Sequence, residues 1–302
     1  MNDTPTSEKL VADLVDLLTV TADGADCFIG QPQKGGMGRV FGGQVIAQGL
    51  QAAQLTAPEG MAAHSLHAYF LRGGKEGPTI NYAIARDFDG RSFANRRVVA
   101  SQTEDRTSKP ILNLTASFQK PEDGLEHQEC QMPDVLPPED LKPDMKLREE
   151  FVAGLPDISD AQRALMLRPR AIEMRTIDWL HWMNSEPKEP RARSWFRTAA
   201  ALPDDPAIHR AVIAYASDYT LLGTAALPHG LSWMRGELNG ASLDHTIWFH
   251  RPAQADEWLL YVTDSPWSGG GRGFNRGSIF SRDGTLVASV AQEGVIRRRK
   301  KS

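Results

Sequence analysis

The sequence has little cysteine, no long apolar run and no excess of basic charge, and each shortage excludes a class of protein. Its 302 residues include two cysteines, Cys27 and Cys130, too few for a disulfide framework or a cysteine-rich metal site. No stretch approaches the ~18–20 consecutive apolar residues that span a bilayer, and the first residues lack the basic segment and apolar core of a secretory signal. Lys and Arg number 34 against 38 Asp and Glu, which argues against a strongly basic nucleic-acid-binding protein. We therefore expect a soluble protein of a reducing compartment, placed in the cytoplasm, with no membrane span and no nucleic-acid partner.

Several common catalytic motifs are also missing. The chain has no G-x-S-x-G nucleophile elbow and no H-E-x-x-H zinc motif, and no glycine-rich segment fits the Walker or dinucleotide-binding patterns. His127-Gln128-Glu129 looks like the start of a deaminase motif, but no C-x-x-C follows it. The sequence therefore gives no reason to expect a cofactor or a bound metal.

The segment 120–150 differs in composition from the rest of the chain. It contains five prolines and ten Asp or Glu residues against four Lys or Arg residues. Such a segment buries little apolar surface and is extended by its own charge repulsion, so we interpret it as a surface linker. We accordingly place an N-terminal domain at 1–119, an acidic, proline-rich linker at 120–167 and a C-terminal domain at 168–302.

Short motifs of the N-terminal half recur, in the same order, in the C-terminal half. The three pairs are separated by 179, 181 and 172 residues: 69–72 with 248–251, 90–93 with 271–274, and 116–118 with 288–290. These nearly constant offsets indicate a duplicated unit that is much longer than a solenoid repeat.

The predicted elements of the two halves also agree in order. Each half has a short strand, then a helix, then four strand-like runs. In the first half these are about 27–31, 43–56, 64–72, 79–87, 92–101 and 110–119, and in the second 193–198, 207–222, 242–251, 257–264, 273–281 and 285–297. A helix followed by a meander of strands predicts an α+β fold in which an antiparallel sheet wraps a helix, present twice.

Two polar residues stand out on otherwise apolar faces. Asp218 lies at the edge of a helical stripe formed by Ile208, Ala211, Val212, Tyr215, Tyr219 and Leu222. A partly buried carboxylate there is a candidate general base, although capping or ion pairing is the more common role. Gln292 is the polar member of a strand face shared with Leu286, Ala288 and Val290. A buried amide more often pairs with backbone groups, and Ser242 and the strand histidines, among them His64, His67, His245 and His250, also have common structural roles.

Taken together, five segments resemble the acyl-CoA thioesterase II family. They are FGGQVIAQ at 41–48, HSLHAYFLR at 64–72, YASD at 215–218, LDHTIWFHRP at 243–252 and ASVAQEGV at 288–295. The similarity runs in order over nearly the whole chain, although the linker and the extreme termini match poorly. It implies a double hotdog fold, with two tandem copies of a helix wrapped by an antiparallel β-sheet.

The resemblance also implies an activity and a site. Members hydrolyse fatty acyl-CoA to free fatty acid and coenzyme A without a metal or a covalent intermediate, and the motifs assign the residues that hold the attacking water to Asp218, Ser242 and Gln292. The family often has threonine where this chain has Ser242. Gly42 and Gly43 are our candidates for the oxyanion site at a helix N-terminus, and His64 is a weaker candidate for substrate contact. Because the first helix has no Asp or Glu over 43–53, we expect one active site per chain.

Two other functions stay open. A hotdog enoyl-CoA hydratase or dehydratase usually pairs an Asp with a His in one element, whereas no histidine follows Asp218 before His229. A non-catalytic acyl-CoA-binding protein would not need a costly set of buried polar groups. We also expect a homo-oligomer, either a dimer or a tetramer, because exposed sheet edges favour assembly.

Overall fold

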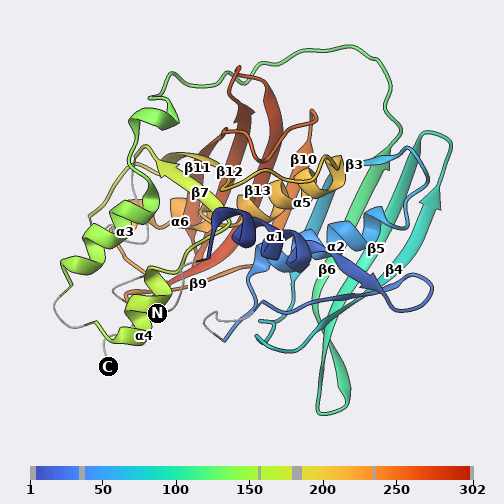
Figure 1. Ribbon diagram of the computed structural model, residues 1–302, viewed down its shortest axis with the longest axis horizontal. Coiled ribbons are helices and arrows are strands. Elements are labelled where there is room, and N and C mark those ends of the chain that lie inside the picture. The colour runs from blue at the N-terminus through green and yellow to red at the C-terminus, as the bar shows by residue number, and fades with distance from the viewer. Residues whose placement is uncertain (1–4, 34–37, 156–157, 179–185, 234–235, 300–302) are drawn as a thin grey trace.

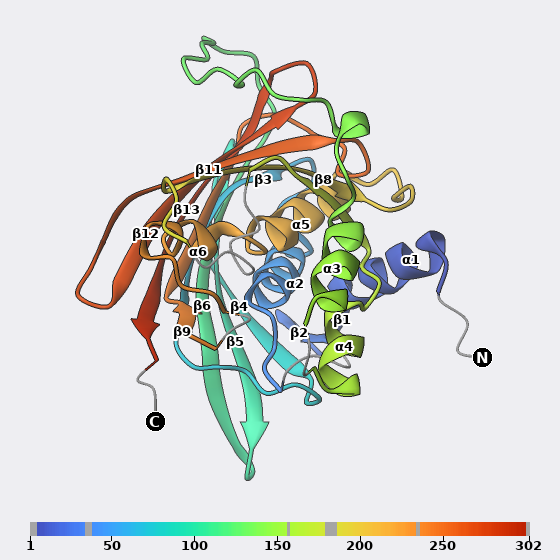
Figure 2. The ribbon, with the colours of Figure 1, turned by 90° about the vertical axis from the view of Figure 1, so that its left-hand side faces the viewer.

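Among the described residues, a curved sheet of 13 strands encloses two helices, α2 and α5 (Figure 1). The computed structural model describes residues 5–33, 38–155, 158–178, 186–233 and 236–299. In this part of the chain, no helix is long and apolar enough to cross a membrane. The two helices lie side by side within the curve of the sheet, as the view turned by 90° also shows (Figure 2).

The elements follow the predicted order in both halves. The N-terminal half contains α1 (Ser7–Leu18), β1 (Val20–Ala22), β2 (Cys27–Gly30), α2 (Gly42–Gln54), β3 (Ala62–Phe70), β4 (Ile80–Asp89), β5 (Phe93–Glu104) and β6 (Thr107–Gln119). After α3 (Asp144–Ala153) and α4 (Asp160–Met166), the chain continues through β7 (Ile172–Thr176), β8 (Arg191–Thr198), α5 (Pro206–Ser217), α6 (Leu221–Thr224), β9 (Leu238–Ser242), β10 (Asp244–Phe249), β11 (Leu259–Gly269), β12 (Arg272–Ser281) and β13 (Leu286–Arg298). Single 3₁₀ turns lie at Pro138–Asp140 and Leu227–His229. The predicted antiparallel sheet wrapped around helices is confirmed.

The strand order of the sheet is mirrored about its centre. The N-terminal half gives β2-β4-β5-β6-β3 and the C-terminal half gives β10-β13-β12-β11-β8, and β3 pairs with β10 to join them. In that central pairing, Leu66 lies opposite Ile247, and both side chains are fully buried. The junction between the halves is thus part of the hydrophobic core.

Helix α2 is buried from Gly43 to Ala53, including its glutamines. The amide nitrogen of each of Gln44, Gln48 and Gln51 donates to a backbone carbonyl, whereas Gln44 Oε1 has no hydrogen-bond partner among the described residues. The Tyr82 hydroxyl donates to Gln48 Oε1 at 2.8 Å, and Gln51 Nε2 donates to the Ala207 carbonyl at the start of α5 at 3.1 Å. The first contact holds α2 against β4 and the second holds it against α5, whose own start is fixed by the Asp205 N-cap and by proline at its first position.

The structure differs from the predicted boundaries near the candidate residues. The helix predicted over 207–222 ends at Ser217, and Asp218 is its C-cap residue. The strand predicted over 242–251 corresponds to β10, which begins at Asp244, and Ser242 is instead the last residue of a separate strand, β9. Asp218 and Ser242 therefore both lie at the ends of elements, where side chains can converge on one point.

The second part of the predicted linker is folded. Helix α3 packs beside β7, and the Asp144 carboxylate accepts hydrogen bonds at 2.9 Å from both the backbone N–H and the hydroxyl of Thr176. Arg148 and Val152 are also buried. The composition of this segment did not indicate helix α3, because two of its buried residues, Asp144 and Arg148, are charged.

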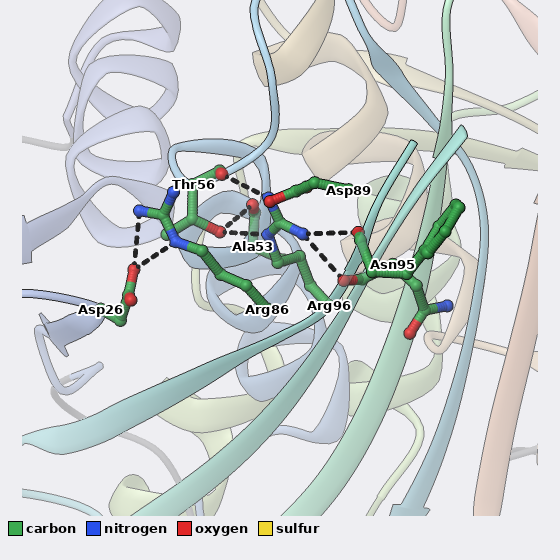
Figure 3. Close-up of polar contacts among 8 residues, drawn as sticks. Asp26, Ala53, Thr56, Arg86, Asp89, Asn95 and Arg96 are labelled. Carbon is green, nitrogen blue, oxygen red and sulfur yellow. Dashed lines mark hydrogen bonds and ion pairs between the residues drawn. The ribbon is translucent and has the colours of Figure 1, made fainter. Parts of the chain in front are cut away.

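In the N-terminal half, the end of α2 is closed by a buried arginine (Figure 3). Arg96 of β5 is fully buried and donates to Thr56 just beyond α2, from Nε to the hydroxyl at 2.9 Å and from Nη2 to the carbonyl at 2.7 Å. It also donates to the Phe88 and Asn95 carbonyls and to the Asp89 carboxylate. Arg96 thereby links the backbone just beyond α2 to strands β4 and β5.

Candidate active site

Asp218 lies where the end of α5 meets the start of α2. Its side chain is 5% exposed and lines a cavity of about 1250 Å³. The cavity wall also includes Gly42 at the start of α2 and Ser242 at the end of β9. Three residues that the sequence analysis selected are therefore brought together from separate elements.

The Asp218 carboxylate accepts three hydrogen bonds. Gln292 Nε2 donates to Oδ1 at 2.6 Å, and the Ser242 hydroxyl donates to the same oxygen at 3.5 Å. The backbone N–H of Gly43 is the third donor. The short bond from Gln292 fixes the carboxylate, whereas the long contact to Ser242 is weak and easily exchanged for another partner.

Burial raises the pKa of Asp218 from its ordinary value of 3.8 to about 6. The cause is loss of hydration of the charged form, which outweighs the stabilising hydrogen bonds from Gln292, Gly43 and Ser242. A carboxylate of this pKa is ionised at neutral pH and is a stronger base than an exposed one. Asp218 is thus suited to take a proton from water.

Gln292 is fully buried behind Asp218 and is not among the residues that line the cavity. Its amide nitrogen also lies 3.0 Å from His245 Nδ1. His245 Nδ1 is itself 3.8 Å from Asp218 Oδ1, so a histidine does lie beside the carboxylate. No histidine follows Asp218 along the chain before His229, and His245 comes close only through the fold, because β10 pairs with β13, which carries Gln292.

A family model described as acyl-CoA thioesterase matches residues 180–295, and one described as acyl-CoA thioesterase N-terminal domain matches residues 31–119. Acyl-CoA thioesterase 2 of Haemophilus influenzae is 37% identical over 288 residues, which cover 95% of this chain and 98% of the relative. The chain belongs to the acyl-CoA thioesterase family. Human acyl-coenzyme A thioesterase 8 is also 37% identical, over 86% of this chain and 81% of its own length.

Solved structures agree with this family assignment. Acyl-CoA thioesterase II TesB2 from Mycobacterium marinum is 35% identical and superimposes with a TM-score of 0.74 over 94% of this chain and 98% of its own. A protein of unknown function described as having a hotdog fold, from Alicyclobacillus acidocaldarius, is 21% identical with a TM-score of 0.73 over 95% of this chain and 99% of its own. The fold of this acyl-CoA thioesterase family member is therefore a hotdog fold.

The two glycines predicted for the oxyanion site lie directly at the carboxylate of this family member. A Cβ atom on Gly42 would lie 2.7 Å from Asp218 Oδ2 and 2.9 Å from Phe70 Cζ, and one on Gly43 would lie 2.5 Å from the Tyr215 carbonyl oxygen. Only glycine allows the start of α2 to approach this closely. The glycine pair therefore helps to set the distance between α2 and Asp218.

We expect Gly42→Ala to lower hydrolysis by about 10–100-fold, because the added methyl must displace the Asp218 carboxylate or Phe70. Gly49→Ala is the matched control in the same helix, since its Cβ would meet its nearest neighbour at 3.5 Å, an ordinary contact. The measurement is kcat/KM for thiol release by the two variants. Equal activity in both would show that the Gly42 contact does not matter for the reaction.

His64 lies apart from this group. It occupies a register shift between β3 and β6, where its Nε2 lies 2.8 Å from the Ser117 hydroxyl and its ring meets Phe93 edge-on. His64 is not among the residues that line the cavity. The structure does not bring it to Asp218, because the irregular pairing turns the side chain toward the neighbouring strand.

Much of the cavity wall comes from residues that the sequence analysis did not select. Helices α3 and α4 and the turn between them contribute Arg148, Leu155, Ile158, Gln162, Leu165 and Met166. The apolar residues within this acidic segment were the sequence feature that could have indicated a buried wall rather than a solvated linker. Among the described residues, no group of His, Cys, Asp and Glu side chains is arranged to hold a metal ion.

Proposed function

We propose that this protein is an acyl-CoA thioesterase that hydrolyses fatty acyl-CoA to free fatty acid and coenzyme A, with Asp218 as the general base. The observation that carries the proposal is the Asp218 carboxylate, which lines a cavity of about 1250 Å³ and has a pKa raised to about 6. Family membership supports the substrate class. The cavity is large enough for a ligand of that size.

The chemical steps need only protein side chains and water. Asp218 takes a proton from water as the water oxygen bonds to the thioester carbonyl carbon. When the tetrahedral intermediate collapses, the carbon–sulfur bond breaks and the proton on Asp218 passes to the leaving thiolate. The Ser242 hydroxyl, 3.5 Å from Oδ1, is placed to hold that water beside the carboxylate.

Gln292 has a different part in this scheme from the one that the resemblance implies. Its amide nitrogen is bonded to Asp218 Oδ1 at 2.6 Å, and its side chain is fully buried. We therefore assign Gln292 to orienting the carboxylate rather than to contacting the water. The hydrogen bond also lowers the pKa of Asp218 against the effect of burial, which keeps the base ionised at neutral pH.

Gly42 is the better of the two candidate oxyanion donors. The Gly43 N–H already donates to Asp218, whereas Gly42 is the first residue of α2 and lines the cavity. The positive end of the helix dipole favours the charge that develops on the carbonyl oxygen.

We further propose that the chain is a double hotdog with one active site, with domains at 1–119 and 168–302 joined by the segment 120–167. The mirrored strand order supports the duplication. The C-cap residue of α2 is Leu55 where that of α5 is Asp218, and α5 begins with Pro206, which lacks an N–H group, where α2 begins with Gly42. The equivalent second site, where the end of α2 meets the start of α5, therefore lacks both the base and the candidate oxyanion donor.

The hydratase alternative is not favoured by the position of His245. That histidine is fully buried, and both of its ring nitrogens lie within hydrogen-bond distance of protein side chains, so it has no route to substrate. A cytoplasmic location and homo-oligomeric assembly are further proposals. The first is supported by the two free cysteines. The second is supported by the exposed apolar side chains of Tyr69, Leu71 and Trp248 beside the β3–β10 junction of the two halves.

We expect thiol release from acyl-CoA to increase with pH through an apparent pKa near 6, because Asp218 must be ionised to act as a base. The measurement is kcat/KM with a chromogenic thiol reagent, on acyl-CoAs of increasing chain length. A profile that is flat from about pH 5 to pH 8, or no release from any acyl-CoA, would contradict the proposal.

A further inference from the structure

His245 forms the middle of a buried chain of hydrogen bonds that ends at Asp218. It lies on β10 and is fully buried. Its Nε2 is 2.9 Å from the Ser217 hydroxyl, and its Nδ1 is 3.0 Å from Gln292 Nε2. Gln292 Nε2 in turn donates to Asp218 Oδ1.

The partners of the chain determine which ring nitrogen carries the proton. The Ser217 hydroxyl donates to the Ala214 carbonyl at 2.9 Å, within α5. Its oxygen is then an acceptor for His245, so the ring proton lies on Nε2 and Nδ1 is an acceptor. Burial lowers the pKa of His245 to about 3, which keeps the ring neutral over the working pH range.

This tautomer determines the orientation of the Gln292 amide. An acceptor at His245 Nδ1 and an anion at Asp218 both require the NH₂ group of Gln292, and its two protons satisfy them. Gln292 Oε1 then points away from both groups and has no hydrogen-bond partner among the described residues. With the opposite tautomer, Nδ1–H would draw Oε1 toward itself, and that oxygen would face the Asp218 carboxylate and disfavour its ionised form.

We propose that His245 and Ser217 are positioning residues for the hydrolysis, because they hold the Gln292 amide with its nitrogen toward Asp218. This inference rests on the proposed role of Asp218. Two titratable groups contact the chain of bonds in the described structure: Asp218 itself, and Tyr261, whose hydroxyl donates to the Ser217 carbonyl at 3.0 Å. The pKa of Tyr261 is raised well above its ordinary value by burial, so Tyr261 stays neutral.

The test compares His245→Leu with His245→Asn. Leucine removes the acceptor for Gln292, whereas the asparagine side-chain oxygen can take the position of Nδ1. For His245→Leu we expect the acidic limb of the kcat/KM profile to move up by about one pH unit, with kcat falling about 10–100-fold and KM changing by less than about 3-fold. For His245→Asn the limb should stay near that of the wild type. His250→Leu is the control, since His250 lies directly after β10 and its ring also contacts a serine, Ser289, but it is exposed.

Two further measurements do not depend on the folding of the leucine variant. Ser217→Ala removes the acceptor that fixes the ring proton, and it should shift the acidic limb in the same direction. Nitrogen-15 spectra of the histidine-labelled wild type should show His245 with Nε2 protonated and Nδ1 free. A proton on Nδ1, or the same pH profile in His245→Leu and His245→Asn, would overturn the inference.

Asp218→Asn, measured beside these variants, separates this inference from the proposed function. If Asp218→Asn keeps the wild-type rate, Asp218 is not the base and the proposed mechanism fails. If Asp218→Asn loses activity but His245→Leu and Ser217→Ala keep the wild-type profile, the positioning role alone fails.

Discussion

Asp218→Asn is expected to lower acyl-CoA hydrolysis by about 10²–10⁴-fold, the usual contribution of a general base, and at the same time to stabilise the fold. The pKa of Asp218 is about 6 in the folded protein against an ordinary value of 3.8. Folding therefore favours the protonated form. The stability associated with that form is present below about pH 4 and is lost as the pH rises through about 6. At ~1.4 kcal/mol per pH unit, the ionised carboxylate costs about 3 kcal/mol at neutral pH.

The neutral amide of asparagine avoids that cost, because its oxygen can still accept from Gln292. The measurements are kcat/KM and thermal unfolding at about pH 5 and pH 8, and the gain in Tm should be larger at the higher pH. Asp264→Asn is the control, because Asp264 is 39% exposed in an ion pair with Arg276 on the outside of the sheet. A lower Tm for Asp218→Asn at pH 8 would show that the hydrogen bonds outweigh the effect of burial.

The central residue of the site, Asp218, could be selected from the sequence, but its hydrogen-bond partners could not. The helical stripe of α5 was enough to select Asp218 as a candidate base, because spacing along a helix indicates which face is buried, but it left a structural role as the more common one. It did not reveal that the Asp218 carboxylate accepts a hydrogen bond from the Gly43 N–H, because Gly43 comes from the other half of the chain. The motif resemblance was needed to connect Asp218 with Ser242 and Gln292, which alone had more common structural interpretations.

His245 was missed as a partner of Asp218 for a related reason. The alternation of β10 predicts that it is buried, but its neighbours are set by the pairing of β10 with β13 and by the turn of α5 at Ser217. Strand register between distant segments is not encoded in a local pattern. Helix α3 of the predicted linker was missed because Asp144 and Arg148 are charged but buried. Charged residues are usually exposed, so their segment was interpreted as a solvent-exposed linker.

Arg96→Met is expected to lower the free energy of unfolding by about 3–5 kcal/mol, which is typical when one partner of a buried, hydrogen-bonded charge is removed. Arg96 makes five hydrogen bonds, three of them to carbonyl oxygens at the end of α2 and in the strands beside it. Methionine fills a similar volume but donates to none of them, so the Thr56, Phe88 and Asn95 carbonyls lose a donor in the interior.

Arg86→Met is the matched control on the same face of the N-terminal half (Figure 3). Arg86 pairs with Asp26, but the two side chains are 49% and 33% exposed, so the loss of that pair should cost no more than about 1 kcal/mol. Denaturant unfolding of both variants gives the comparison. Below its unfolding transition, Arg96→Met should retain the wild-type kcat, because Arg96 lies at the end of α2 opposite to Gly42 and Asp218. A similar small loss of stability in both variants would mean that water replaces the guanidinium at little cost. A loss of kcat in folded Arg96→Met would mean instead that the end of α2 affects the position of Gly42 at its start.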